Sequence, residues 1–245
     1  GSPGPAAASG RPAPTHVTRW LSSKSGRPDV LEAAGLRRDQ APEPVAQWVP
    51  EVGVGFMFAP GHHAAMKHAI GPRREMGVRT VFNVLGPLTN PAGVPNQVLG
   101  VFSDELVEPM AEVLQRLGSR HVMVVHSRDG LDEISIGDKT EVAELKDGAV
   151  RRFSIRPEDF GIQRAAVDAI KVEDASGSLK IIRSVLEDHA GPARDIVVLN
   201  AGAAIYVAGL AESHEEGVKK ADEAIAGGEA LRRLERLVVL TQGFE

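Results

Sequence analysis

Two short apolar runs on either side of a helix-like segment constrain the fold more than any other feature of this sequence. Residues 97–102 and 121–126 are each long enough for a strand, and the second run is apolar enough to be buried on both faces. Between them, a helix can begin at Ser103 or Asp104 and end at Gly118. Because parallel strands are joined by a crossover helix, the pattern predicts a βαβ unit in an α/β fold whose mostly parallel sheet is covered by helices.

Other segments predict further elements of this fold. The apolar residues 53–59 predict a buried strand, and the Asp-Gly pair at 147–148 predicts the turn of a hairpin between residues 141–145 and 151–155. We also expect a helix over residues 178–189, a short buried strand over 195–199, and three helices from Asn200 onward, separated by Gly209 and by Gly227 and Gly228.

The N-terminal segment has a different composition from the rest of the chain. Residues 1–18 are rich in Gly, Pro, Ala and Ser and have almost no large apolar side chain, so burial cannot offset the entropy lost on ordering them. We therefore expect a flexible tail or a non-native remnant over residues 1–18. One α/β domain is expected over residues 19–245, with elements of a small helical domain near residues 42–92.

Composition excludes several kinds of function. The formal net charge of −5 gives no overall electrostatic reason to bind nucleic acid or an anionic membrane. The chain has no cysteine, which excludes disulfides, thiolate nucleophiles and cysteine-ligated metal sites. No run approaches the roughly 20 apolar residues that a membrane-spanning helix needs. We expect a cytoplasmic protein that binds neither nucleic acid nor membranes.

Two adjacent acidic residues are the first candidates for chemistry. Asp132 and Glu133 lie in a loop directly after the strand predicted at 121–126. Ligands of open α/β sheets bind outside the carboxyl ends of the strands, and Mg²⁺ commonly uses one or two carboxylates together with substrate phosphates. The alternative is an ordinary acidic surface turn.

Three other groups of polar residues have both a functional and an ordinary interpretation. Arg73 and Arg74 could bind a carboxylate through two parallel hydrogen bonds, or they could be solvated. His62 and His63 fit pocket lining or capping better than metal binding, because no further metal ligands follow at a suitable spacing. The small polar loop 22–26 could cradle a phosphate, although many such loops bind nothing.

Several segments, which occur together and in order, resemble the anthranilate phosphoribosyltransferase family. The resemblance extends from Ser22 to the C-terminus, and its most specific part runs through Pro91. The matching segments are Ser-Ser-Lys-Ser-Gly (22–26), Asp-Val-Leu-Glu-Ala (29–33), Gly-Phe-Met-Phe-Ala-Pro (55–60), His-His (62–63), Arg-Arg-Glu-Met-Gly (73–77), Arg79 to Pro91, Asp-Gly-Leu-Asp-Glu (129–133) and Val-Leu-Asn-Ala (198–201).

The resemblance implies a fold and a reaction. A small helical domain would join a larger α/β domain, with the active site between them. Two chains would form a homodimer through their helical domains. The reaction would transfer the phosphoribosyl group of phosphoribosyl pyrophosphate (PRPP) to the amino nitrogen of anthranilate, in tryptophan biosynthesis. Mg²⁺ would neutralise charge on the departing pyrophosphate.

The resemblance also implies roles for individual residues. Asp132 and Glu133 match the magnesium-binding acidic pair, and Arg73 matches the arginine that contacts the anthranilate carboxylate. His63, Met66 and Gly86 match family positions that line the route of the aromatic substrate. The family positions that contact PRPP correspond to Ser22, Ser23, Lys24, His16 and Arg19.

The N-terminal part departs from the family pattern. Where the family has Lys-His-Gly-Asn-Arg, residues 15–19 keep His16 and Arg19 but have no lysine, glycine or asparagine. The family's glycine-rich phosphate loop, Gly-Thr-Gly-Gly-Asp, has no counterpart in residues 1–18. Two alternatives stay open. A pyrimidine nucleoside phosphorylase shares the serine–lysine–serine loop, although the run from Arg79 to Pro91 and the acidic pair argue against it. A catalytically silent chain could still bind anthranilate.

Overall fold

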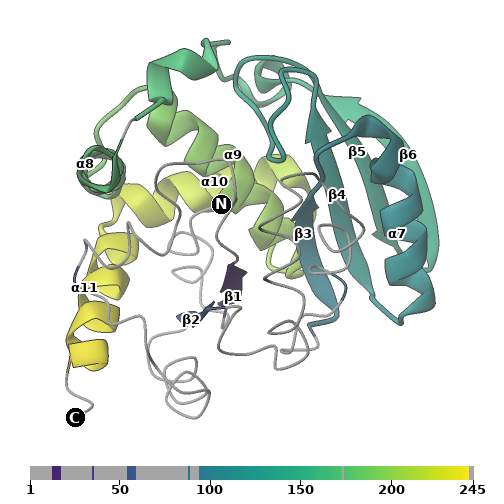
Figure 1. Cartoon of the computed structure of the whole chain (residues 1–245), viewed down its shortest axis with the longest axis horizontal. Helices are drawn as coiled ribbons and strands as arrows, with labels where there is room; N and C mark the ends of the chain where they lie inside the picture. The colour runs from purple at the N-terminus through teal and green to yellow at the C-terminus, as the bar shows by residue number, and fades with distance from the viewer. Residues whose placement is uncertain are drawn as a thin grey trace, which may run out of the picture.

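The computed structural model describes residues 35, 88, 94–172 and 174–242, together with the backbone of residues 13–17 and 54–58. The elements expected for a helical domain near residues 42–92 lie outside the described residues, apart from the strand at 54–58 and Leu88. The described part consists of a sheet with helices on both sides (Figure 1), which confirms the α/β fold class.

The main sheet has the strand order β3-β4-β5-β6. Its strands are β3 (Asn96–Gly100), β4 (His121–Ser127), β5 (Thr140–Lys146) and β6 (Ala149–Ile155). β3 and β4 are parallel and joined by a helix, as predicted, whereas β4 with β5 and β5 with β6 are antiparallel. The predicted hairpin is confirmed, because Asp147 and Gly148 both have positive φ, as a two-residue hairpin turn requires.

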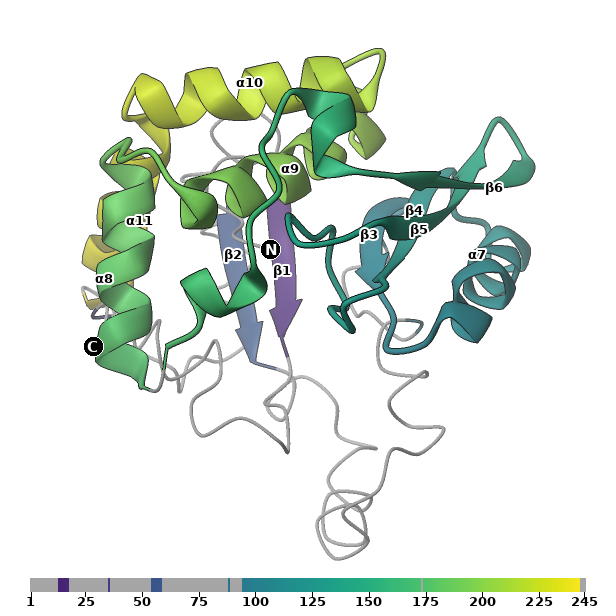
Figure 2. The ribbon, with the colours of Figure 1, turned by 90° about the horizontal axis from the view of Figure 1, so that it is seen from above.

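Alternate residues of β4 enter two separate apolar cores. Val122 and Val124 pack in the core beneath helix α7 (Val107–Arg116), whereas Met123 and Val125 belong to the core that contains helix α9 (Pro192–Val207). Successive side chains of a strand point to opposite faces, so a strand covered on both faces must be apolar throughout. Figure 2 shows α7 and α9 on opposite sides of the sheet.

The crossover helix α7 buries one face and ends as its sequence predicts. Its buried residues, Val107, Met110, Ala111 and Leu114, have the spacing of a single helical face. Gly118 has a φ of 88°, and the hydrogen bonds Gly118 N to Gln115 O (3.0 Å) and Ser119 N to Leu114 O (3.0 Å) close the helix as a Schellman motif.

The beginning of this helix differs from the expected one. A 3₁₀ turn, Asp104–Leu106, precedes α7, and neither Ser103 nor Leu106 caps through its side chain. The carboxylate of Asp104 instead accepts a hydrogen bond of 2.6 Å from Arg152 on β6. An ion pair with a neighbouring strand therefore replaces the expected cap.

The strand expected over residues 195–199 is wrong, because these residues form part of the helix α9. This helix is buried over most of its surface, so it has no polar face to reveal a helical period. A short apolar run of this kind cannot be distinguished from a buried strand by periodicity alone. The helical signal lies outside the run, in Pro192 at the first turn and in the continuation of the apolar residues to Val207.

Three further helices complete the described part: α8 (Ala175–Leu186), α10 (His214–Ala226) and α11 (Glu229–Gln242). Together with α9, they confirm the helices expected at 178–189 and from Asn200 onward, although α9 begins at Pro192 and α8 at Ala175. Short 3₁₀ turns at Pro157–Phe160 and Val167–Ile170 connect β6 to α8.

A smaller sheet pairs β1 (Ala13–Val17) in parallel with β2 (Val54–Phe58). β2 confirms the strand expected over residues 53–59. β1 lies within residues 1–18, for which a flexible tail or a non-native remnant stays a prediction.

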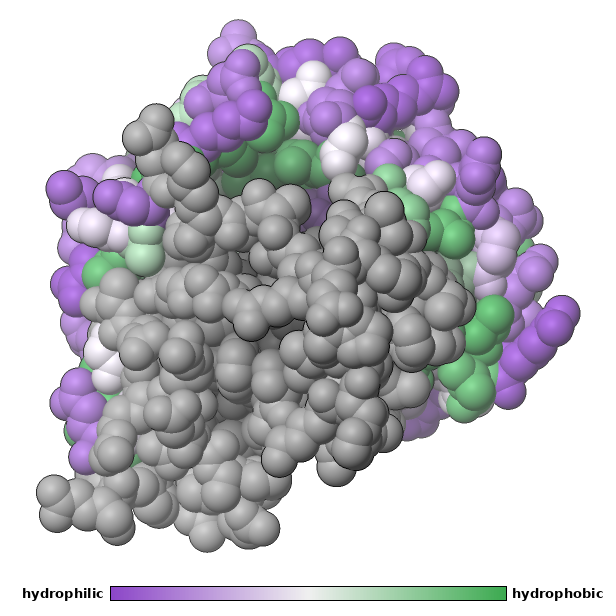
Figure 3. Space-filling model, viewed as in Figure 1, coloured by the Kyte–Doolittle hydropathy of each residue, from purple (hydrophilic) through white to green (hydrophobic). Residues whose placement is uncertain are grey.

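None of the helices in the described ranges is long and apolar enough to cross a membrane. In the view of Figure 3, hydrophilic residues predominate along the outer rim of the described surface, and several hydrophobic ones lie toward its inner edge.

Candidate active site

The acidic pair lies on the loop 128–139, which connects β4 to β5. Both Asp132 and Glu133 are partly buried, between the exposed turn at 128–130 and the fully buried residues Ile134 and Ile136. The loop follows the carboxyl end of β4, as expected for a ligand-binding loop of a parallel strand pair.

This loop crosses the end of the neighbouring strand at Gly100. A Cβ atom at Gly100 would overlap the carbonyl oxygen of Asp132 and lie 3.2 Å from the Cβ of Asp132. Glycine is therefore required here because two backbone segments approach too closely for any side chain. The contact places Asp132 over the carboxyl end of β3, beside that of β4.

A buried amide from α9 holds the residue that follows the pair. Asn200 Oδ1 accepts a hydrogen bond of 2.9 Å from Ile134 N, and Asn200 Nδ2 donates one of 2.8 Å to Ile134 O. Both backbone groups of Ile134 are thus satisfied by one side chain from a distant helix.

Ser135 organises the second half of the loop. Its hydroxyl donates a short hydrogen bond to Asp129 and accepts one of 2.8 Å from Gly137 N. Its backbone N–H donates to Thr140 Oγ1 at 3.2 Å. Because Ser135 is fully buried, its hydroxyl serves the loop and is not available as a nucleophile.

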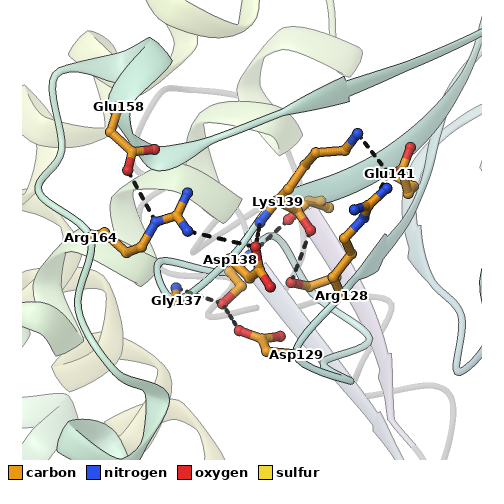
Figure 4. Close-up of polar contacts among 11 residues, drawn as sticks. Arg128, Asp129, Gly137, Asp138, Lys139, Glu141, Glu158 and Arg164 are labelled. Carbon is orange, nitrogen blue, oxygen red and sulfur yellow. Dashed lines mark hydrogen bonds and ion pairs between the residues drawn. The ribbon is translucent and has the colours of Figure 1, made fainter.

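Ion pairs surround the base of the loop (Figure 4). Arg128 and Lys139 both approach Glu141 Oε1, at 3.3 Å and 3.2 Å. Arg164 lies between Glu158 and Asp138, with Nε 3.0 Å from Glu158 and Nη1 3.7 Å from Asp138. Hydrogen bonds from the backbone of Glu158 itself and from Arg164 hold the pKa of the Glu158 carboxyl below its usual value.

The comparisons with known proteins agree on one family. A family model described as the a/b domain of a glycosyl transferase family matches residues 4–231. The anthranilate phosphoribosyltransferase of Thioalkalivibrio sulfidiphilus is 66% identical over 96% of this chain and 70% of its own length. The chain belongs to the anthranilate phosphoribosyltransferase family. Members of this family transfer the phosphoribosyl group of PRPP to anthranilate, a step of tryptophan biosynthesis.

Solved structures of anthranilate phosphoribosyltransferases have the same fold. The enzyme of Thermus thermophilus superposes with a TM-score of 0.92 at 43% identity, over 99% of this chain and 72% of that one. The Saccharomyces cerevisiae enzyme, in complex with PRPP and Mg, superposes with a TM-score of 0.87 at 28% identity, over 99% of this chain and 69% of that one.

The donor set of the loop fits a magnesium ion that is shared with a substrate. Within the described ranges, no group of three or more His, Cys, Asp or Glu residues could hold a metal by itself. The adjacent carboxylates Asp132 and Glu133 would supply hard oxygen ligands, and Mg²⁺ usually completes such a set with water and substrate phosphates. The substrate PRPP of an anthranilate phosphoribosyltransferase can supply these phosphate ligands, because it carries a pyrophosphate group.

The other residues implied by the family resemblance lie outside the described residues or have only their backbone described. His16 lies in β1, where the structure gives the backbone alone. Ser22, Ser23, Lys24, Arg19, His63, Met66, Arg73 and Gly86 lie outside the described residues.

Sequence reasoning missed two residues that shape this site. The sequence marks Gly100 only as part of a strand, and Asn200 only as the start of a helix and part of a matching segment. A glycine within an apolar strand and an amide within an apolar run were the available signals, since both residue types are disfavoured there without a specific contact.

Proposed function

We propose that this chain catalyses transfer of the phosphoribosyl group of PRPP to the amino nitrogen of anthranilate, with Asp132 and Glu133 holding Mg²⁺. The observation that carries the proposal is the position of the acidic pair. Asp132 packs over the end of β3, on the loop that leaves the end of β4, in a chain of this family. Mg²⁺ bound there would neutralise the charge that develops on the departing pyrophosphate.

The protein residues contribute mainly by positioning and electrostatics. Gly100 and Asn200 fix the course of the loop, so the two carboxylates are held in place before the substrate arrives. Arg73, through its match to the family, would bind the carboxylate of anthranilate and direct the amino group toward the ribose. No covalent intermediate is needed, because pyrophosphate is already a good leaving group.

A steady-state assay of this chain tests the proposal directly. The chain is mixed with anthranilate, PRPP and Mg²⁺, and the loss of anthranilate fluorescence is followed. We expect turnover that stops when magnesium is chelated and returns when excess Mg²⁺ is added. A folded sample without turnover would contradict the proposal and support the alternative of a silent chain, which calorimetric titration with anthranilate would then test.

Assembly into a homodimer stays a prediction from the family resemblance. Light scattering coupled to size-exclusion chromatography would test it, because a dimer of this chain has twice the 26.0 kDa mass of the monomer.

A further inference from the structure

We propose that Asn200 is a positioning residue for catalysis, which sets the place of the magnesium-binding pair by fixing the backbone that follows it. The inference rests on the proposed function, since it concerns the loop that would hold Mg²⁺. Asn200 does not itself belong to the acidic pair. It acts through Ile134, the residue directly after Glu133.

The acidic pair lies between two anchored points of the loop. Before the pair, the carbonyl of Leu131 accepts a hydrogen bond of 2.9 Å from Ser127 N at the end of β4. After the pair, both backbone groups of Ile134 bond to the Asn200 amide, at 2.9 Å and 2.8 Å. Only two residues separate these points, so a shift of either anchor must move the carboxylates.

The two anchors differ in origin. Ser127 and Leu131 are four residues apart, and their bond forms within the turn itself. Asn200 lies 66 residues after Ile134 and belongs to a helix of the other layer. The second anchor therefore couples the position of the loop to the packing of α9 against the sheet.

The side chain at position 200 must be an amide for this contact. The amide oxygen accepts a hydrogen bond from Ile134 N. The amide nitrogen donates one hydrogen bond to Ile134 O and a second, of 2.9 Å, to Ile196 O on its own helix. A carboxylate would face two carbonyl oxygens without a proton to donate, and an aliphatic side chain would leave both groups of Ile134 unpaired.

The burial of Asn200 makes its contact with Ile134 costly to lose. Asn200 is 9% exposed and lies on a helix of an apolar core, so water cannot readily replace its amide. A leucine there would leave the backbone N–H and C=O of Ile134 unpaired. A fully bonded buried polar group specifies one arrangement of the chain, so the Asn200 amide fixes the course of the loop.

The test uses Asn200→Leu, with Ile205→Val as the matched control. Ile205 is a fully buried residue of the same helix, and its shortened side chain touches no hydrogen bond of the loop. For Asn200→Leu we expect the Mg²⁺ concentration at half-maximal activity to rise about 10-fold or more, as for other residues that orient metal ligands. The KM for anthranilate should stay within about twofold of the wild-type value. The control should leave both values unchanged.

Amide hydrogen exchange at Ile134 gives a readout that does not depend on turnover. We expect faster exchange at Ile134 in Asn200→Leu than in the wild type or the control, since the hydrogen bond that protects this N–H is gone. If Asn200→Leu does not fold, Asn200→Ser provides a smaller side chain that cannot span the same distance, and the same results are expected.

The outcomes separate this inference from the proposed function. A wild-type chain without turnover contradicts the proposed function, and the positioning role is then decided by the exchange at Ile134. Unchanged exchange in the Asn200 variants overturns the positioning role. In an active enzyme, an unchanged Mg²⁺ concentration at half-maximal activity also overturns the role. The same holds if this concentration and the KM for anthranilate rise equally.

Discussion

The backbone of Gly100 packs directly against the carbonyl group of Asp132, without room for a side chain between them. Gly100→Ala should therefore displace the loop that carries the acidic pair. We expect a loss of magnesium-dependent turnover of about 10-fold or more, because small misplacements of catalytic groups are costly. Gly177→Ala is the control, since Gly177 lies on α8 outside the loop and a Cβ there would come no closer than 3.2 Å to another atom, the side-chain oxygen of Asp174. Steady-state kinetics of both variants check this, and equal activities would show that the loop tolerates the displacement.

Removing one carboxylate of the acidic pair should weaken Mg²⁺ binding more than anthranilate binding. In Glu133→Ala we expect a higher Mg²⁺ requirement and slower turnover, with anthranilate binding little changed. Asp138→Asn removes the same charge from the same loop and should have a small effect, since Asp138 pairs with Arg164 at 3.7 Å and is not one of the two adjacent acidic residues. Titration with Mg²⁺ at fixed PRPP distinguishes the two variants. If Glu133→Ala weakened Mg²⁺ binding and anthranilate binding equally, the result would contradict the assigned role.

Arg73→Ala should weaken the binding of anthranilate but not that of PRPP. A guanidinium binds a carboxylate through two parallel hydrogen bonds, and their loss should raise the KM for anthranilate while the KM for PRPP stays nearly constant. Arg73→Lys should recover only part of the affinity, because an ammonium group cannot make the same paired contact. An unchanged KM for anthranilate in Arg73→Ala would rule out the contact.

The carboxyl group of Glu144 should make stability depend on acidic pH. Burial raises the pKa of Glu144, but hydrogen bonds with His121 and Tyr206 outweigh this effect and hold the pKa below its usual value. A lowered pKa in the folded state gives stability that is present above the unfolded value near 4.5 and is lost as the pH falls through the folded value. Urea unfolding of the wild type and Glu144→Gln should show a steeper loss in the wild type below pH 4.5. Parallel curves would contradict the prediction.

Gly202→Ala should destabilise the fold even though alanine favours helices. A Cβ at Gly202 on α9 would lie 2.6 Å from the backbone nitrogen of Val218 on α10, which cannot rotate away. Alanine gains up to about 1 kcal/mol in helix propensity, whereas forcing atoms into a packed interface costs about 1 to 3 kcal/mol. We expect a lower free energy of unfolding, measured by urea denaturation. A net stabilisation would mean that the two helices separate at little cost.

The elements that the sequence predicted well are those with local signals. The strands β3 and β4 and the helix α7 followed from apolar spacing, and the β5–β6 hairpin followed from the Asp147-Gly148 pair. Their conformations depend on residues within a few positions of each other. The position of the loop after β4 also follows from a local signal, because the loop comes directly after a buried strand.

What the sequence could not predict depends on contacts between distant segments. The sequence predicts a strand at residues 195–199, within α9, because burial of most of this helix removes the polar face that marks a helix. The contact of Asn200 with Ile134 spans 66 residues, and that of Gly100 with Asp132 spans two strands of the fold. No spacing rule along the chain indicates such pairs.

The contact between Asn200 and Ile134 also sets a condition on the order of folding. Ile134 leaves the ribosome 66 residues before Asn200 does, so the acidic loop lacks its second anchor until α9 has been synthesised. A chain that stops before α9 would contain both carboxylates without that anchor. If the pair holds Mg²⁺ as proposed, metal affinity would report whether the C-terminal helices of a nascent chain have docked.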